Sequence, residues 1–352
     1  MPALAQSGEG PAIGTQLRDG LTLGGYATVE LDVPRGSTPA IGANGVADIH
    51  RNAADAPPAA RSQATGRTTL ALSHLSAILW WEPSPQWKLL AEVDSQHGLQ
   101  IPAHDEGRDR PDSGATLALE RIYADWRASD ALTWRVGKFL TPIGRWNQDH
   151  PDPLTWTTSR PLLSRSAFPA NATGVMAFGS TSLGLSDVDY QIYVAPGQNW
   201  RAGAAQDAFS RAVGARVVLP LGSDAQLGIS IAGFNQRDED TDHRRLGGLD
   251  LLWQLGRLQV HAEVLSRRGG DGYESSEHGG FVQLVHPLGA GWSGVLRVEK
   301  LEYESRPALH STVLGVVFKG HRHWVFKAEY DRTSTDSPDL PSGWQLSVTG
   351  LF

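Results

Sequence analysis

Residues 21–33 read LTLGGYATVELDV. Leucine, alanine and valine side chains fall on one face of this stretch, and polar side chains from Thr22 to Asp32 fall on the other. Side chains that alternate with a period of two indicate a β-strand with one apolar and one polar face. Such a strand belongs at a boundary between an apolar and an aqueous environment.

The same alternation recurs to the last residue and predicts about sixteen strands. Two of them shift phase partway, near His74 and near Glu120, and we interpret the shifts as β-bulges. The predicted strands lie at about 21–33, 67–81, 86–96, 115–128, 132–140, 173–179, 186–195, 208–219, 225–235, 246–255, 257–267, 278–287, 291–303, 308–319, 323–333 and 343–352.

The connections between these strands alternate between long and short, with one exception at 304–307. Long loops at one end and tight turns at the other are typical of outer-membrane barrels. The fold class predicted is therefore all-β: a transmembrane antiparallel β-barrel with long extracellular loops and short periplasmic turns. We expect residues 21–352 to form this single barrel domain. The long connections lie at about 34–66, 97–114, 141–172, 196–207, 236–245, 268–277 and 334–342.

Aromatic residues support the same orientation. Seven tryptophans fall at strand ends next to the short turns, where an aromatic belt at the membrane interface would place them. The chain ends on Phe352, which shares one face of its strand with Trp344, Leu346 and Val348. A last strand ending in an aromatic residue resembles the terminal signature of bacterial outer-membrane proteins. The seven tryptophans are Trp81, Trp87, Trp126, Trp134, Trp253, Trp292 and Trp324.

Composition excludes several classes of protein. No apolar run approaches the roughly 20 residues of a transmembrane helix. There is no cysteine, which removes disulfides and thiolate metal sites, and the net charge of −7 argues against a nucleic-acid partner. No catalytic or phosphate-binding motif is present, so we expect neither catalytic residues nor a cofactor.

The N-terminal segment 1–20 is interpreted as a signal-peptide remnant followed by a periplasmic segment. Ala3-Leu4-Ala5 before Gln6 resembles the small-residue end of a secretory signal.

The loop at about 140–171 is the strongest functional candidate. It is rich in proline, which blocks strand pairing, and its apolar residues need a surface to pack on. We expect it to fold into the barrel and narrow the pore, with an external loop making subunit or lipopolysaccharide contacts as the alternative. Its candidate solute contacts are Arg145, Arg160, Arg165, Asp149 and Asp152, because guanidinium groups bind carboxylate and phosphate bidentately.

Residues 137–144 read GKFLTPIG and close one strand before this loop. This stretch resembles the strand-to-loop junction of the phosphate-selective porin family. The resemblance implies a sixteen-stranded barrel, often trimeric, that carries anions. Members selective for phosphate use a lysine-rich pore, whereas this chain has only five lysines: Lys88, Lys138, Lys300, Lys319 and Lys327.

The strand pattern also turns charged side chains toward the lumen. The pore candidates on the wall, in addition to the loop residues, are Arg121, Arg135 and Arg216. Further charged wall residues are Arg297, Lys327, Glu263 and Glu329. Such residues are more typical of a solvated wall than of a selectivity element. Three stretches could suggest a metal site: Asp149 to Asp152, residues 238–243, and the pair His321 and His323. A rigid turn with two prolines nearby explains the first better, and solvated turns explain the other two, so we predict no metal.

The sequence thus predicts a porin in the bacterial outer membrane. Its partners would be membrane lipid, lipopolysaccharide and small hydrophilic solutes, some of them anionic, and its assembly a homotrimer. Two alternatives remain: a barrel that sheathes or scaffolds a partner protein, and a barrel enzyme such as a phospholipase, for which no outward Ser and His pair with an orienting group is evident.

Overall fold

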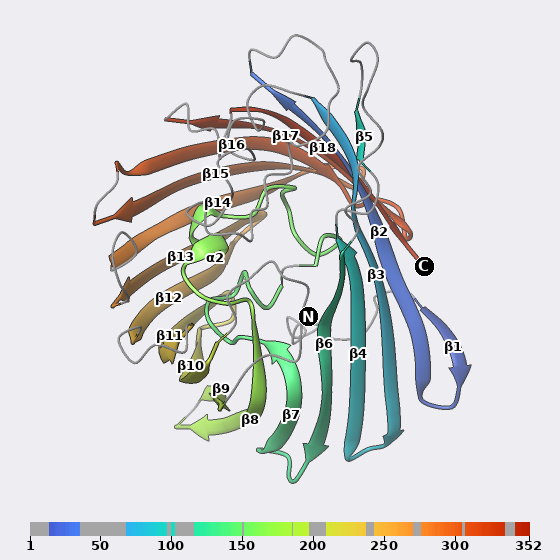
Figure 1. The fold of residues 1–352 in the computed structure, drawn as a ribbon, viewed down its shortest axis with the longest axis vertical. Coiled ribbons are helices and arrows are strands. Elements are labelled where there is room, and N and C mark those ends of the chain that lie inside the picture. Colours follow the sequence, from blue (N-terminus) through green and yellow to red (C-terminus); the bar gives the residue numbers. More distant parts are fainter. Residues whose placement is uncertain are drawn as a thin grey trace.

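A computed structural model describes residues 14–35, 68–96, 100–102, 116–149, 151–184, 186–196, 209–236, 243–269, 276–304, 307–334 and 342–352. Antiparallel strands dominate it (Figure 1). They are β1 (Gly14–Arg18), β2 (Leu21–Pro34), β3 (Thr69–Ser84), β4 (Trp87–Gln96), β5 (Gln100–Pro102), β6 (Thr116–Arg127), β7 (Thr133–Leu140), β8 (Asn171–Leu183), β9 (Ser186–Ala195), β10 (Arg211–Leu221), β11 (Ala225–Asn235), β12 (Arg244–Leu255), β13 (Leu258–Arg268), β14 (Ser276–Gly289), β15 (Trp292–Tyr303), β16 (Leu309–Phe318), β17 (Trp324–Thr333) and β18 (Gly343–Leu351).

Sixteen of these strands close into a barrel. Each pairs with its neighbours along the chain, and β18 pairs with β2 to complete the ring. Phe352 extends this seam, since its backbone N–H and C=O both pair with Gly25, at 3.1 and 2.9 Å. Closure leaves no sheet edge, which a membrane barrel requires. The predicted fold class is confirmed.

Two short strands lie outside the ring and were not predicted. β1 pairs with β2 beside Leu21 to Gly24, beyond the point where β18 ends. β5 pairs with residues 69–71 of β3, beyond the end of β4. Both are too short to show a periodic pattern, and β1 falls within the segment 1–20 that we assigned to the N-terminal region. Residues 1–13 of that segment lie outside the described residues.

Details of the strand prediction are also confirmed. The register shifts between Thr28 and Val29 opposite His74, and between Glu92 and Val93 opposite Glu120, the two places where bulges were expected. The short turns join β3 to β4, β6 to β7 and every second pair after them. β8, the strand after the loop at about 140–171, was expected to begin at about 173 and begins instead at Asn171.

The two faces of the barrel wall differ as expected for a membrane protein. Outward apolar side chains are exposed, among them Trp87, Trp126 and Trp134, which lie opposite one another on β4, β6 and β7. Inward side chains are largely polar and yet buried, because a segment of the chain itself fills the lumen. None of the helices described is long and apolar enough to cross a membrane.

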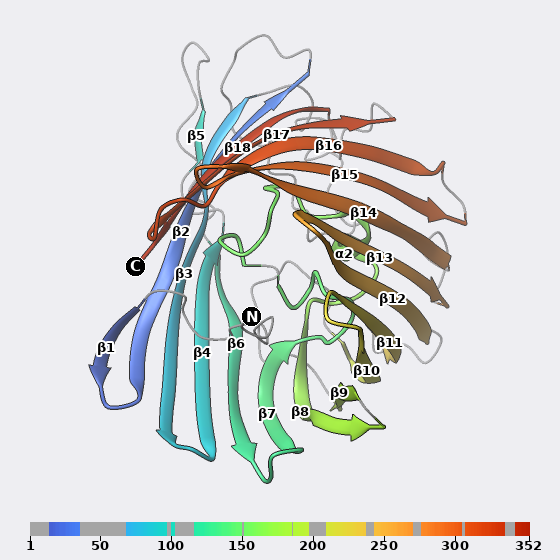
Figure 2. The ribbon, with the colours of Figure 1, turned by 180° about the vertical axis from the view of Figure 1, so that it is seen from behind.

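The filling segment is the connection between β7 and β8, residues 141–170, which we call the lumen loop. Figures 1 and 2 show it passing through the interior of the barrel, with its short helix α2 (Leu162–Ser166) facing the strands from β12 to β15. Its helix contacts β14 and β15. The barrel wall therefore positions this loop, and the functional candidates lie on both.

Candidate functional site

Three glutamates of the barrel wall bind backbone N–H groups of the lumen loop. Glu263 on β13 accepts from Arg145 at 2.8 Å and from Trp146 at 2.5 Å. Glu329 on β17 accepts from Thr158 and Ser159 at 2.8 and 2.7 Å. Glu299 on β15 accepts from Leu162 at 2.6 Å. Hydrogen bonds to an ionised acceptor are the stronger kind, so these acids fasten the loop at three places on alternate strands.

Cations of the same wall bind the carbonyl side of the loop. Lys327 donates to the carbonyl oxygens of Asp152 and Thr157 at 2.7 and 3.0 Å, and to the hydroxyl of Thr155. Arg297 donates to the carbonyl and hydroxyl oxygens of Ser159 at 3.0 and 2.7 Å. The acids thus accept from the N–H groups and the cations donate to the carbonyl oxygens. Loop backbone groups that would otherwise be buried without partners are satisfied in this way.

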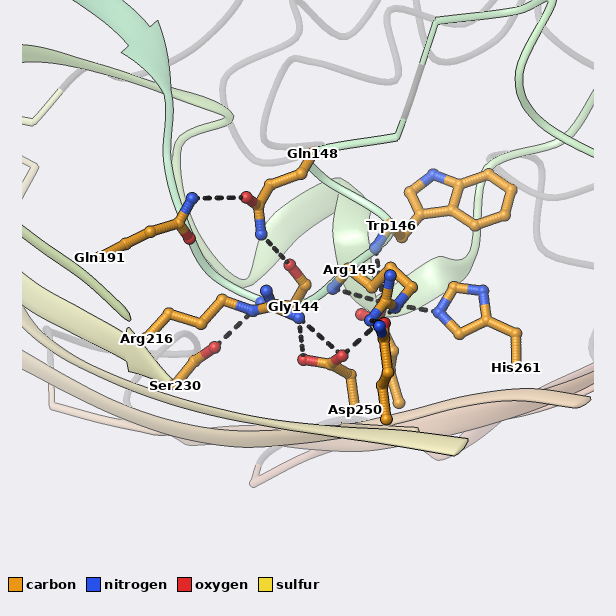
Figure 3. A network of polar contacts seen from close by, with 11 residues as sticks. Gly144, Arg145, Trp146, Gln148, Gln191, Arg216, Ser230, Asp250 and His261 are labelled. Carbon is orange, nitrogen blue, oxygen red and sulfur yellow. Dashed lines mark hydrogen bonds and ion pairs between the residues drawn. The ribbon is translucent and has the colours of Figure 1, made fainter. Parts of the chain in front are cut away.

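The first turn of the loop forms its own network against β11 to β13 (Figure 3). Gly144 donates its N–H to Ser230 at 3.2 Å, and the guanidinium of Arg145 donates to Gln226 at 2.8 Å. Arg145 also lies 3.6 Å from Asp250, whose carboxylate accepts from Arg216 at 2.7 Å. Gly144 has a φ of +64°, and a Cβ at that position would lie 2.5 Å from a carboxylate oxygen of Glu263. A side chain there would displace this anchor.

Apolar packing fixes the second half of the loop. Leu162, Leu163 and Phe168 are buried in one hydrophobic cluster with inward side chains of the wall, including Leu265 and Leu301. Trp156 packs against a separate patch of four inward valines and donates its ring N–H to Gln259 at 2.9 Å. The expectation that the apolar residues of this loop need somewhere to pack is met inside the barrel.

The junction that resembles phosphate-selective porins has a structural role in this chain. Lys138 is buried and donates to the carbonyl oxygen of Leu119 at 2.6 Å, and Asn171 donates to that of Glu120 at 2.8 Å. β7 pairs with β6 from Ile122 onward, so these carbonyls lie beside the bulge and beyond the last residue pair of the two strands. The two side chains at the ends of the lumen loop therefore bind backbone carbonyls of β6 beside its bulge.

The five predicted loop residues lie in different settings. Arg145 is held by Gln226 and Asp250, and Arg160 is half-buried and interacts electrostatically with Asp152. Burial raises the pKa of Asp149 above its usual value, against the opposing attraction of Arg145. Arg165 lies in α2, and its side chain is outside what the structure describes.

Asp152 sits where the loop lies against the strands beside the closing seam of the barrel. Burial acts to raise the pKa of its carboxyl, but His74, Lys327 and Arg160 outweigh that effect and hold the pKa below its usual value. His74 comes from β3 and Lys327 from β17, the strands on either side of the β18–β2 pair, so Asp152 lies beside the seam that closes the ring. Asp152 is the acid of the five whose negative charge is stabilised.

The three predicted wall arginines face the lumen, are buried and are paired with acids. Arg121 lies 2.5 Å from Glu92, Arg135 2.7 Å from Asp125, and Arg216 2.7 Å from Asp250. A carboxylate beside each guanidinium reduces the field that a passing solute would meet. Arg216 and Arg145 share Asp250, which links wall and loop candidates in one network.

The residues that anchor the lumen loop were expected to face the lumen but not to bind the loop. Glu299 was not singled out, whereas Glu263, Glu329, Arg297 and Lys327 were assigned to a solvated wall. Their inward position follows from strand alternation. Their partners do not, because the path of an irregular loop leaves no periodic signal in the sequence.

The lysines do not gather along one path. Lys138 binds Leu119, Lys327 and Lys319 bind the lumen loop, and Lys300 faces outward in contact with Glu302. The structure thus shows no lysine-rich lining among the residues it describes. Within those residues no group of three metal-binding side chains comes together, and positions 238–242 and 150 lie outside them.

These features define a class of fold: a sixteen-stranded porin barrel with a loop inside its lumen. Similar solved structures include an anion-selective porin from Comamonas acidovorans (TM-score 0.57, 12% identity, covering 94% of this chain and 99% of that one). The outer-membrane channel DcaP of Acinetobacter baumannii (0.60, 10%, 96% and 99%) and Salmonella typhi OmpF in complex with daunomycin (0.60, 10%, 97% and 100%) are others.

Sequence comparison adds little to this fold assignment. No model of a known protein family matches the chain. An uncharacterized protein of Aquifex aeolicus (strain VF5) is 27% identical over 118 residues, which make up 33% of this chain and 24% of that protein. The chain therefore matches about a quarter of the length of that relative.

Proposed function

We propose that this protein is a porin of the bacterial outer membrane that lets small hydrophilic solutes, anions among them, diffuse through its barrel. The observation that carries the proposal is the lumen loop. A closed barrel of sixteen strands is wide enough for an aqueous channel, and a loop fastened across its lumen would set the size and charge of what passes. The similar structures include porins and channels, one of them described as anion-selective.

The position of the lumen loop favours a channel over the two alternatives. A sheath for a partner protein would need its lumen free, whereas here wall residues from β9 to β18 bind the chain's own loop. For an enzyme, polar residues would have to converge on a reacting group. Instead, some wall charges bind the loop backbone, as Glu263, Glu329 and Lys327 do, and the wall arginines pair with neighbouring acids. We propose a channel without catalytic activity, and lipase and protease assays on purified protein test that part.

A homotrimer is the proposed assembly. The outward side chains of Leu117 on β6 and of Ile192 and Val194 on β9 are 73%, 52% and 46% exposed, and they lie toward the long-loop end of the wall. Apolar side chains at this level fit a neighbouring subunit. Chemical cross-linking in native membranes should then give a ladder that ends at three copies, and a ladder that ends at one would overturn the assembly.

Planar bilayer recordings test the channel itself. Purified full-length protein should produce stepwise ion conductance, and a salt gradient across the bilayer should give a reversal potential that reports its charge preference. Folded protein that is heat-modifiable on gels but produces no conductance steps would overturn the proposal.

A further inference from the structure

Six consecutive strands, β12 to β17, each carry one exposed cationic side chain on the outer surface near the long-loop end. We call this set the basic belt. It consists of Arg245, Arg268, His278, Lys300, His310 and Arg332. None of these side chains can reach the lumen, because each shares the outward face with exposed apolar residues such as Leu249, Val264 and Leu314.

The basic belt keeps a constant separation from the aromatic belt at the other end of the wall. On four strands the outward aromatic residue and the outward cation are eight positions apart, an even number that keeps them on one face. The four pairs are Trp253 with Arg245, Trp292 with Lys300, Phe318 with His310, and Trp324 with Arg332.

This separation spans the apolar part of a membrane. Eight residues at about 3.4 Å extend about 27 Å along a strand, and the usual strand tilt of about 35–45° leaves roughly 20 Å along the membrane normal. The apolar band of such barrels is about 25 Å tall. If the tryptophans mark one interface, the basic belt lies at the headgroup level of the opposite leaflet.

Like charges in the basic belt face each other on neighbouring strands. Arg245 lies directly opposite Arg268 in the register of β12 and β13, and Lys300 lies opposite His310 in that of β15 and β16. Like charges directly opposite on one sheet face are destabilising. Within these six strands the outward acid at this level is Glu302, which pairs with Lys300 and lies 2.8 Å from His278. An anionic partner would relieve the repulsion.

The outward cations at this level are concentrated on one side of the barrel, although Arg211 on β10 and Arg35 just after β2 are exposed there too. At the same level the outward side chains on β4, β6 and β9 are Ser95, Leu117 and Val194. A general need for solubility at the rim would distribute charge around the whole circumference. A cluster of cations centred on β12–β17 fits an arc that faces anionic lipid.

We propose that the basic belt binds the phosphate groups of lipopolysaccharide in the outer leaflet. Guanidinium groups hold phosphate bidentately, and clustered cations at a membrane surface bind anionic headgroups. Phosphates would lie between Arg245 and Arg268 and beside the neighbouring cations. The inference rests on the proposed outer-membrane location, with the long loops outside.

Native mass spectrometry of the full chain in detergent tests the proposal, with bisphosphorylated lipid A as the probe. The variant R245Q/R268Q/R332Q should bind lipid A about 100-fold more weakly than the parent, at about 1 kcal/mol for each cation near an anionic surface. The matched control R127Q/R257Q/R322Q removes three exposed arginines at the short-turn end and should bind like the parent. Dephosphorylated lipid A should bind the parent and both variants equally weakly.

Three results would overturn the proposal: unchanged binding in the belt variant, an equal loss in the control variant, or equal binding of phosphorylated and dephosphorylated lipid by the parent. Heat-modifiability on gels verifies that each variant folds. Channel activity is a separate readout, since the belt variant should conduct like the parent in a phospholipid bilayer. If the protein binds lipid A but produces no conductance, the porin proposal is wrong and the proposal that the basic belt binds lipopolysaccharide is retained.

Discussion

The carboxylate of Glu329 on β17 accepts the backbone N–H of Ser159 at 2.7 Å, which ties the middle of the lumen loop to a strand far around the ring from its origin at β7. The same carboxylate accepts the backbone N–H of Thr158, and the neighbouring Lys327 donates to the carbonyl oxygens of Asp152 and Thr157. An irregular segment can cross a lumen only if its backbone groups find partners, and here the wall supplies them.

Replacing Glu329 by alanine should therefore loosen the lumen loop. Two backbone N–H groups would lose their acceptor, at a cost of about 1–3 kcal/mol if they stay buried. We expect a lower free energy of unfolding in urea and noisier single-channel currents. The control is Glu82→Ala, which removes an exposed acid 3.5 Å from Lys88. Equal behaviour of the two variants would show that Glu329 does not hold the loop.

Gly144 should be intolerant of a side chain for two reasons, a close contact and a positive φ. A second glycine, which has the positive φ without the contact, allows the two to be tested apart. A Cβ at Gly144 would meet Glu263 at 2.5 Å, and its φ of +64° is costly for alanine, by about 1–2 kcal/mol. Gly256 has a φ of +60° with nothing near its Cβ position. Both alanine variants should lose stability, but only Gly144→Ala should change conductance. Identical conductance in the two would contradict the anchoring role of Glu263.

Channel selectivity should depend on pH through Lys319, which lies just past the end of β16. Burial lowers the pKa of its ammonium to about 7, with a smaller contribution from Lys327. Its ammonium donates to the carbonyl of Leu154 at 2.9 Å and lies 4.2 Å from the ring centroid of Trp156. Because the pKa is lowered, the charge is present below pH 7 and is lost as the pH rises through it.

We therefore expect anion preference to fall between about pH 6 and pH 8, measured as reversal potential in a fixed salt gradient. The variant Lys319→Met should show a smaller change over this range. A pH profile unaffected by the substitution would assign the titration elsewhere.

Removal of Phe352 should impair assembly. Its backbone pairs with Gly25 at the seam between β18 and β2, and its ring lies where a side chain on Gly25 would be, 2.8 Å from that position. Deleting it, or replacing it with aspartate, should lower the amount of heat-modifiable barrel in the membrane while secretion continues. Leu183→Asp is the control, since it places a charge at an exposed strand end away from the seam. Full assembly of the Phe352 variants would argue against this role.

The barrel could be predicted from the sequence because a strand records its environment at every second residue. The alternation from Leu21 to Val33 identified both faces of β2, and the phase shifts near His74 and Glu120 located two bulges. The lumen loop was predicted from its prolines and apolar residues. These properties show that a segment is rigid and needs to pack, and they say nothing of its partners.

The anchors of that loop lay beyond sequence reasoning for a physical reason. Glu263 and Glu329 are separated from Arg145 and Ser159 by more than a hundred residues, and their contacts depend on closure of the whole ring. The role of Lys138 could not be predicted either. Its place in a family-like motif suggested transport, whereas its ammonium donates to the carbonyl of Leu119 beside a bulge. Charge alone does not distinguish a residue that meets solute from one that holds the fold.

The arginines of the lumen loop remain the residues expected to govern the passage of anions. Arg145 is only partly compensated, at 3.6 Å from an Asp250 that already binds Arg216, and Arg160 is half-buried rather than enclosed. In a narrow lumen their fields are weakly screened, since the Debye length of physiological salt is about 8 Å. The variant R145Q/R160Q/R165Q should therefore shift the reversal potential toward cation preference.

Conductance of this triple variant should change little, because glutamine and arginine differ modestly in bulk. R245Q/R268Q/R332Q is the matched control: it removes three arginines on the outer surface, which the barrel wall separates from any solute in the lumen. It should keep the reversal potential of the parent in a phospholipid bilayer. If the loop variant matches the parent as well, the loop arginines do not line the conducting path. The barrel and its anchoring glutamates would then stand, and selectivity would have to reside in the wall.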